Sequence, residues 1–345
     1  MFLVENIIRS ACRKLDDVSL NILVISENNE KYMSLVCQTG HNFYLWAADN
    51  RSWDSRAEKK PENLQVIDAD WPTTYFDMII CNDRLEQYDL AVSLAHKFHL
   101  PVLLIDHCSS DVIKPLHALT RVDMESPQTQ LVKNPAVTVP VSGPVSLSWP
   151  TAKLRLVIPP AIDTNKFCIP DKRPSSPDFG ANLTQRRIVL DNQIPPEVAE
   201  SIFGAFGDTA YSVIPTDSDI GEKEKIYAEG DYFINSQNYV TVKMLESMAC
   251  GNIPICFSTP DLVGFIENGV NGFIVENSND IAPLLLRLDK ISEEERSQIS
   301  NNARKKIVSE SCITNEDFIS KWKNVLNYMK SQYYGAAWNS GIPEV

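Results

Sequence analysis

Short apolar runs alternate with segments of helical periodicity along most of the chain. In the first half, the runs that we interpret as strands lie at 20–26, 43–47, 64–67, 78–81 and 102–105. Residues 83–99 have helical spacing, with Leu85, Leu90 and Leu94 on one face, before Pro101 leads into the next strand. Strands that alternate with helices in this way are typical of a parallel sheet covered by helices on both faces. The pattern predicts a doubly wound α/β domain.

The second half repeats this alternation. Strands are expected at 187–190, 211–214, 232–235, 253–257 and 272–275, with a helix at 242–249 and charged helices from 281 to 332. Residues 137–160 contain several prolines and suit short strands and turns. The stretch 171–180 reads D-K-R-P-S-S-P-D-F-G and has the composition of a linker. We therefore place one domain at 1–170, a second at 181–315, and a final helical segment at 316–345.

Composition narrows the class of protein. A length of 345 residues suits two domains, and 45 acidic against 32 basic residues give a formal net charge of −13, which disfavours nucleic acid as a partner. The eight cysteines include no C-x-x-C pair and resemble buried residues of a reduced, cytoplasmic protein. Because no apolar run approaches the roughly 18 residues that span a bilayer, we expect neither a signal peptide nor stable membrane insertion.

The most informative stretch is 232–276. A predicted strand ends at Ser236, and after a short loop a helix runs from about Thr241 to Gly251. The start of a helix that follows a parallel strand faces the carboxyl edge of the sheet, where its free N–H groups and dipole can hold a diphosphate. Glu246 lies about one and a half turns into this helix, at a position expected to be exposed, from which its carboxylate could bind a ribose diol.

Several motifs in this stretch resemble those of the retaining GT-B glycosyltransferases of family 4. The matching residues are Glu246, the run M-A-C-G-N-I-P-I at 248–255 and the turn N-G-V-N-G-F at 268–273. A second run at 157–167, V-I-P-P-A-I-D-T-N-K-F, resembles the interdomain segment of the same family. The resemblance implies an α/β GT-B fold, with two Rossmann-like domains facing across a cleft and a C-terminal helix that crosses back to the N-terminal domain.

The resemblance also implies a reaction. The C-terminal domain would bind a nucleoside diphosphate sugar, with a UDP-sugar favoured, and the sugar would pass to a hydroxyl acceptor with retention of configuration. The leaving diphosphate assists the incoming hydroxyl in such enzymes, so no protein nucleophile, metal or other cofactor is expected. Catalysis then depends on positioning and on stabilisation of the leaving charge.

The chain departs from the family pattern at three places. The family has two glutamates separated by seven residues, and the first of them falls on Asn238. The basic pair that follows the first strand of the family's C-terminal domain is not visible in 190–193. Residues 27–30 stand where the family has a glycine-rich loop after the first strand of its N-terminal domain. The charge that neutralises the diphosphate must come from elsewhere, and the candidates are Lys243, Arg187 and Lys223. The predicted donor contacts are Glu246, Asn238, Tyr239, Val240, Thr241 and Arg187.

Catalytic and acceptor residues are expected in both halves. The run P-V-L-L-I-D-H ends at His107 and resembles the family's strand whose histidine lies near the transferred sugar, which makes His107 a predicted catalytic residue. Lys243, on the first helical turn, is the second, as a charge next to the diphosphate. His41 and Trp46 could shape an acceptor pocket, because aromatic rings stack on sugars and bases alike. Three of these residues also have a structural interpretation: His107 as a strand-end residue, His41 as a turn residue and Lys243 as a surface residue.

The acceptor stays open between a glycan, a small molecule and a hydroxymethylated DNA base. The compact size and the missing glycine-rich loop resemble phage-encoded glycosyltransferases, some of which modify viral DNA, and such an enzyme would work in the host cytoplasm. An epimerase and a binding-only protein on the same scaffold are further alternatives. The donor base, the sugar and the oligomeric state do not follow from the sequence.

Overall fold

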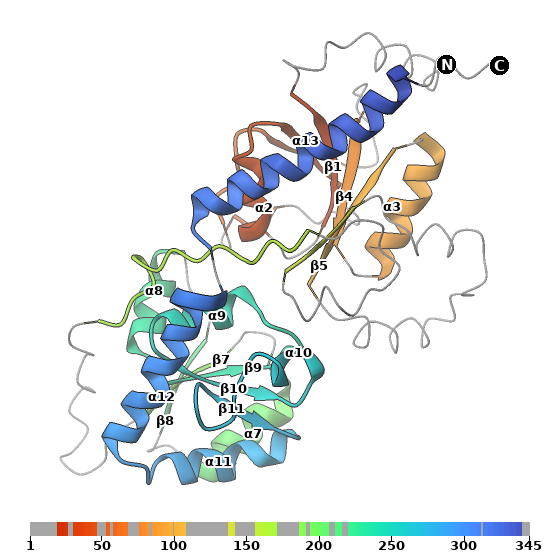
Figure 1. Cartoon of the computed structure of the whole chain (residues 1–345). Coiled ribbons are helices and arrows are strands. Elements are labelled where there is room, and N and C mark those ends of the chain that lie inside the picture. Colours follow the sequence, from red (N-terminus) through yellow and green to blue (C-terminus); the bar gives the residue numbers. More distant parts are fainter. Residues whose placement is uncertain are drawn as a thin grey trace. The chain divides into compact units, whose positions relative to one another are not determined.

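The chain folds into two compact α/β units (Figure 1). Our computed structural model describes residues 19–26, 30–46, 53–55, 58–67, 76–82, 85–98, 100–107, 137–141, 156–170, 186–190, 194–206, 211–215, 220–311 and 313–339. The first unit combines Met1–Pro159 with Asn315–Val345, and the second is Pro160–Thr314. The division at Pro160 lies ahead of the linker-like stretch 171–180, which is outside the described residues.

The first unit contains a six-stranded parallel sheet of order β3-β2-β1-β4-β5-β6. Its strands are β1 (Asn21–Ile25), β2 (Asn42–Trp46), β3 (Leu64–Ile67), β4 (Met78–Asn82), β5 (Val102–Asp106) and β6 (Val137–Pro140). The chain moves outward from β1 to β3 and then restarts on the other side of β1 with β4. This order confirms the predicted doubly wound domain and places a topological switch point between β1 and β4.

Among the described residues, three helices flank this sheet: α2 (Glu30–Cys37), α3 (Leu85–Phe98) and the C-terminal α13 (Asn315–Asn339). Helix α3 covers the face that carries Leu23, Ile79 and Leu104, and α2 and α13 lie on the other side of the sheet (Figure 1). Helix α13 packs on α2 through its apolar stripe, in which Phe318 and Trp322 are fully buried. The C-terminal helix therefore belongs to the core of the first unit.

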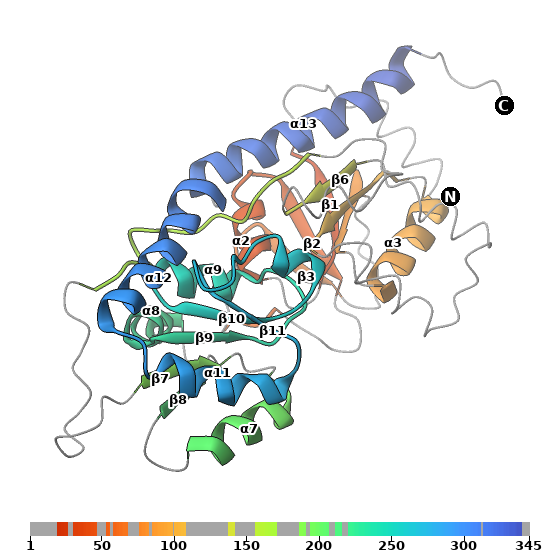
Figure 2. The ribbon, with the colours of Figure 1, turned by 60° about the horizontal axis from the view of Figure 1, so that its bottom comes forward.

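The second unit contains a five-stranded parallel sheet of order β11-β10-β9-β7-β8 (Figure 2). Its strands are β7 (Arg186–Leu190), β8 (Tyr211–Pro215), β9 (Tyr232–Asn235), β10 (Ile253–Phe257) and β11 (Phe273–Val275). The chain leaves β7 for β8 and then returns to the opposite side of β7 with β9. Strands β7 and β9 therefore form the switch point of this sheet, the place where ligands bind in open α/β sheets.

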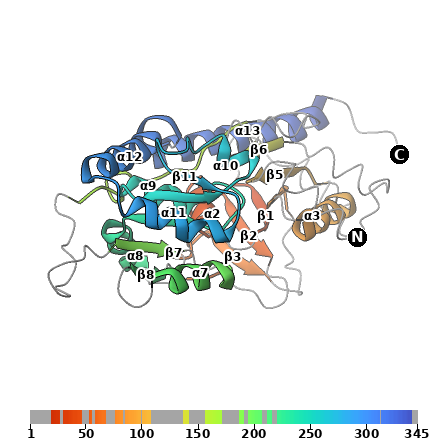
Figure 3. The same ribbon diagram turned by 90° about the horizontal axis from the view of Figure 1, so that it is seen from below.

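Helices cover both faces of the second sheet, as Figure 3 shows from below. They are α7 (Pro196–Phe206), α8 (Ile220–Glu229), α9 (Val242–Ala249), α10 (Pro260–Val263), α11 (Ile281–Leu288) and α12 (Glu293–Lys306). One core cluster joins α8 and α9 to the sheet, and a second joins α7 and α11 to its other face. No helix in the described part of the chain is both long and apolar enough to span a membrane.

The segment 160–170 begins the second unit. Ala161 forms a β-bridge with Ile313, and Phe167 is buried against Tyr227 of α8. The guanidinium of Arg304 donates to the carbonyl oxygens of Phe167 and Ala249, so α12 ties this segment to the end of α9. These contacts assign residues 160–170 to the second unit, although the sequence placed them in the first domain.

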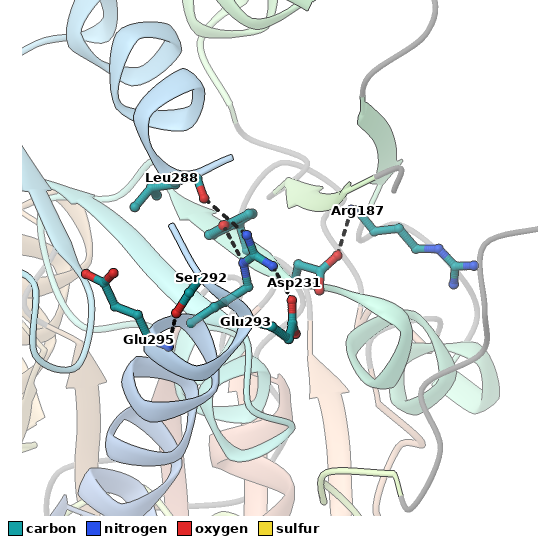
Figure 4. Close-up of polar contacts among 8 residues, drawn as sticks. Arg187, Asp231, Leu288, Ser292, Glu293 and Glu295 are labelled. Atoms are coloured by element: carbon teal, nitrogen blue, oxygen red, sulfur yellow. Dashed lines mark hydrogen bonds and ion pairs between the residues drawn. The ribbon is translucent and has the colours of Figure 1, made fainter. Parts of the chain in front are cut away.

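A buried arginine stabilises the amino end of β9 (Figure 4). Arg296 is 3% exposed, and its Nε donates to the Tyr232 hydroxyl at 3.2 Å, while its two terminal nitrogens donate to Glu293 and to the Leu288 carbonyl. Ser292 caps the helix that carries it by accepting from the Glu295 N–H at 3.1 Å. Because each of these partners is a protein group, the arginine has a structural role here.

Candidate functional site

The candidate site of the second unit lies at the carboxyl ends of β7 and β9. Strand β9 is fully buried and ends at Asn235, after which residues 236–241 lead into α9. Since β7 and β9 flank the switch point, this loop and the start of α9 lie at the place where open α/β sheets bind their ligands. The sequence predicted this strand, loop and helix correctly.

Asn235 determines the shape of the loop. Its side chain is fully buried, and Nδ2 donates to the carbonyl oxygens of Gln237 at 3.1 Å and Tyr239 at 3.0 Å. Its Oδ1 accepts from the Thr241 hydroxyl at 3.3 Å. One amide side chain thus holds the loop at three points, and the Thr259 hydroxyl holds a fourth by donating to the Asn238 carbonyl at 2.9 Å.

Helix α9 begins with a side-chain cap. Thr241 has extended backbone angles, and its Oγ1 accepts from the Met244 N–H at 3.1 Å. A helix start presents four N–H groups without an intrahelical partner, and a threonine cap satisfies one of them. The remaining donors and the helix dipole favour an anion at this end. Around it, Asn238 is exposed and Tyr239, Val240 and Lys243 are half-buried.

Glu246 is buried, with 3% of its surface exposed. This corrects the expectation of an exposed helix position, and it also rules out a plain solvated surface residue. The reason is that α9 packs into the core along most of its length, with Met244, Leu245 and Met248 in one apolar cluster. A carboxylate is rarely buried unless a polar partner compensates its desolvation. Lys243, three residues earlier, occupies a neighbouring position on the helix surface.

Arg187, predicted as a donor contact, lies near the amino edge of the second sheet. It is near the amino end of β7, and its N–H donates to Asp231 at 3.1 Å (Figure 4). Its guanidinium pairs with Glu229 at 2.8 Å. In a parallel sheet the amino ends share the edge opposite to the carboxyl ends, so the backbone of Arg187 lies near the edge opposite to the start of α9. Lys223 lies in the first turn of α8, which follows the carboxyl end of β8, and stays a candidate.

His41, predicted as an acceptor residue, lies at the amino edge of the first sheet. It precedes β2, and its Nδ1 accepts a hydrogen bond from the Leu20 N–H at 3.4 Å. Burial and the charge of Lys330 lower the pKa of His41, against the opposing effect of Asp77. The structure therefore gives His41 a role in holding the amino edge of the first sheet, and separates it from the predicted catalytic His107. Trp46 ends β2 at the carboxyl edge and is half-buried against the core under α3.

His107 is the first residue after β5, at the carboxyl edge of the first sheet, and is half-buried. The ring of Tyr32 from α2 contacts it edge-on, with centroids 5.5 Å apart. Tyr32 is itself buried, and its hydroxyl accepts from Trp322 Nε1 of α13 at 3.3 Å. Burial raises the pKa of Tyr32, so the phenol stays neutral. Helices α2 and α13 thus fix the environment of His107.

Two polar features at the switch points were missed from the sequence. One is Asn235, and the other is the buried pair in which Asn82 Nδ2 donates to Ser26 Oγ at 2.7 Å, between β4 and β1. A signal was present, because each asparagine closes an otherwise apolar run, Y-F-I-N and M-I-I-C-N. Residues 27–29 and 191–193, where the family pattern is lost, lie outside the described residues.

Comparisons with known proteins agree with this geometry. Residues 240–306, from the start of α9 to the end of α12, match the family described as Glycosyl transferases group 1. No curated protein matches the sequence.

Solved structures show where the fold recurs. Sucrose-phosphate synthase from Thermosynechococcus elongatus is similar with a TM-score of 0.67 at 11% identity, over 91% of this chain and 100% of that one. HepE from Anabaena, solved with UDP and glucose, gives 0.64 at 10% identity over 90% and 99%. A glycosyltransferase from Rickettsia africae gives 0.56 at 12% identity over 92% and 99%. The chain therefore has the GT-B fold of these solved structures, and a segment of its second unit matches the Glycosyl transferases group 1 family.

Proposed function

We propose that the protein moves a sugar from a nucleoside diphosphate sugar, preferably a UDP-sugar, to a hydroxyl acceptor with retention of configuration. The observation that carries this proposal is the position of α9, which starts at the β7–β9 switch point with a capped N-terminus and a buried glutamate in its second turn. The group 1 family match begins at this helix, and a structural neighbour was solved with UDP.

The donor would lie across the start of α9. The first-turn N–H groups and the dipole of the helix would bind the diphosphate, and Lys243 would add a full positive charge next to it. Lys223 in the first turn of α8 would supply a second charge. Glu246 would accept hydrogen bonds from the ribose hydroxyls, and residues 238–241 would line the diphosphate and the sugar.

In this proposal the chain acts mainly by positioning and by stabilising charge. Retention requires the acceptor hydroxyl to attack from the face that the leaving group vacates, so a leaving phosphate oxygen can take the hydroxyl proton. Negative charge then grows on the diphosphate, where Lys243 and the helix dipole stabilise it. His107 is proposed as the catalytic residue of the first unit, acting next to the transferred sugar, and no resident metal is required.

The acceptor is proposed to be a hydroxyl of a glycan or of a small molecule. Trp46 at the carboxyl edge of the first sheet offers an aromatic surface for such a ligand. A formal net charge of −13 disfavours the DNA alternative, since a polyanion would be repelled at long range.

The test is an incubation of the purified protein with UDP-, GDP- and ADP-sugars, with and without a panel of hydroxyl acceptors. Release of nucleotide that depends on an acceptor, with a product of unchanged anomeric configuration by NMR, is the expected result. An inverted product would contradict retention. An isomerised donor without acceptor would indicate an epimerase, and tight nucleotide binding without turnover would indicate a binding-only protein.

A further inference from the structure

Asn235 connects the switch point of the second sheet to the start of α9. It is the last residue of β9, adjacent to β7, and no part of its side chain reaches solvent. Its amide uses one nitrogen for two loop carbonyls and its oxygen for the hydroxyl of Thr241. That same hydroxyl caps α9 by accepting from Met244. The chain of contacts therefore runs from the sheet, through Asn235 and Thr241, to the first turn of the helix.

We propose that Asn235 is a positioning residue for the donor diphosphate, acting through Thr241 and the loop 236–241. This inference rests on the proposed function, because it assumes that the donor binds at the start of α9. In this view Asn235 touches no substrate. It fixes the direction of the loop and of the first helical turn, so that their N–H groups are already aligned when the diphosphate arrives.

Such pre-alignment has a physical basis. A segment that must order itself when a ligand binds loses conformational entropy at that moment, and the loss reduces the affinity. A loop held at Gln237, Tyr239 and Thr241 has lost this freedom on folding instead. The benefit concerns the phosphate-binding end of α9, whereas Glu246 is held separately by the packing of the second helical turn. Loss of Asn235 should therefore weaken phosphate binding more than nucleoside binding.

Asn252 provides a matched control at the other end of the same helix. It is also fully buried, and its Nδ2 donates to the Tyr227 carbonyl at 2.9 Å and to the Ser247 hydroxyl at 2.7 Å. It precedes β10 at the amino edge, away from the loop 236–241. Replacing either asparagine removes a buried amide with two donated hydrogen bonds, so a general loss of stability should be similar in both variants.

The experiment measures the affinities of UDP and uridine for the full chain, by calorimetry for UDP and by ligand-observed NMR for uridine. Asn235→Leu should weaken UDP about tenfold and uridine by no more than about twofold, since aligned bonds to a charged phosphate account for most of the difference between the two ligands. Asn252→Leu should lower the melting temperature as much and leave the affinity for UDP within about twofold of the wild type.

Thr241 gives a second route that does not alter the buried asparagine. Thr241→Val keeps the shape and removes the hydroxyl that joins Asn235 to Met244, and Thr241→Ser restores it. The valine variant should reproduce the selective loss of UDP affinity, and the serine variant should bind like the wild type. If Asn235→Leu fails to fold, unchanged UDP affinity in Thr241→Val still overturns the positioning role.

The measurements distinguish a failure of the proposed function from a failure of the positioning role. A wild-type chain that binds none of UDP, GDP and ADP overturns the proposed function and this inference with it. Tight UDP binding by the wild type together with unchanged binding by Asn235→Leu or Thr241→Val overturns only the positioning role. An equal loss of UDP affinity in the Asn235 and Asn252 variants, or an equal loss of UDP and uridine affinity, assigns Asn235 to general stability.

Discussion

The aromatic ring of Tyr32 stands edge-on against the imidazole of His107, with 5.5 Å between the centroids and 78° between the planes. Tyr32 in turn meets Phe318 and Trp322 of α13, so residues nearly three hundred positions apart in sequence set the environment of one histidine. The C-terminal helix therefore contacts Tyr32, which in turn contacts the residue that follows β5.

This contact predicts different effects for two Tyr32 variants. Tyr32→Phe keeps the ring against His107 and leaves Trp322 Nε1–H without its acceptor, which should lower the free energy of unfolding by about 1–2 kcal/mol. Turnover should stay near that of the wild type. Tyr32→Leu removes the ring as well and should reduce turnover more than the phenylalanine variant does. Urea denaturation and initial rates measure the two effects, and equal turnover in both variants would contradict the packing role.

A His107→Ala variant tests the catalytic proposal. It should lower kcat much more than it weakens binding of UDP, because a residue next to the reacting sugar acts on the transition state and does not touch the nucleotide. Initial rates and calorimetry with UDP separate the two quantities. The exposed His96 of α3 offers a control, and His96→Ala should retain wild-type turnover. Unchanged kcat in His107→Ala would return His107 to an ordinary strand-end role.

A Glu246→Gln variant tests the ribose contact. It keeps the shape of the side chain and removes its charge, and should weaken UDP at least tenfold, because hydrogen bonds to a charged group contribute about 1.5–3 kcal/mol each. A 2′-deoxy analogue of UDP should lose much less affinity on the variant than UDP does, since the shared contact is already absent. Glu267→Gln, at an exposed position, is the control. Wild-type affinity in a folded Glu246→Gln chain would place the nucleotide elsewhere.

Arg187 and Lys243 lie at opposite edges of the second sheet, so their variants should differ in affinity for UDP. Arg187→Met removes the ion pair with Glu229 at the amino edge and should leave the affinity for UDP unchanged. Lys243→Met removes a charge from the first turn of α9 and should weaken UDP by roughly tenfold, with a smaller salt dependence than in the wild type. Titrations at low and high ionic strength measure this. If Arg187→Met weakened UDP binding and Lys243→Met did not, the diphosphate would bind at the amino edge of the sheet.

His41 predicts a pH dependence of stability. Burial lowers its pKa below the ordinary value of 6.5, so below that pH the unfolded chain binds a proton more readily than the folded one. The free energy of unfolding should therefore be largest above pH 6.5 and fall as the solution is acidified. His41→Asn, which keeps an acceptor for the Leu20 N–H, should reduce this slope. An unchanged slope in His41→Asn would assign the pH dependence to other groups.

The sequence by itself determined the class of fold and the location of the main motif. Apolar β-rich runs separated by helical periods form parallel sheets regardless of finer detail, so the expected strands at 232–235 and 253–257 coincide with β9 and β10. The motif residues are local in sequence, and so the strand, loop and capped helix around Thr241 could be predicted together. Strand β6 was not named in advance, because the proline-rich 137–160 favours short strands without fixing their positions.

The position of a residue before or after a predicted parallel strand already indicates the edge of the sheet at which the residue lies. A residue that precedes a parallel strand lies at the amino edge, which places His41 away from His107, and Arg187 lies at the start of β7 for the same reason.

The tertiary structure alone decided the strand orders, the burial of Glu246 and the contacts of Asn235 and Tyr32. Strand order depends on pairings between distant segments, as in β7 with β9, and the local pattern of either strand is compatible with several neighbours. Burial of a helix position depends on which elements pack around it, and α9 is covered by the sheet, α8 and α12 together. Side-chain contacts such as Tyr32 with Trp322 arise only when α13 returns to the first unit, because no local sequence preference brings residues so far apart in the chain into contact.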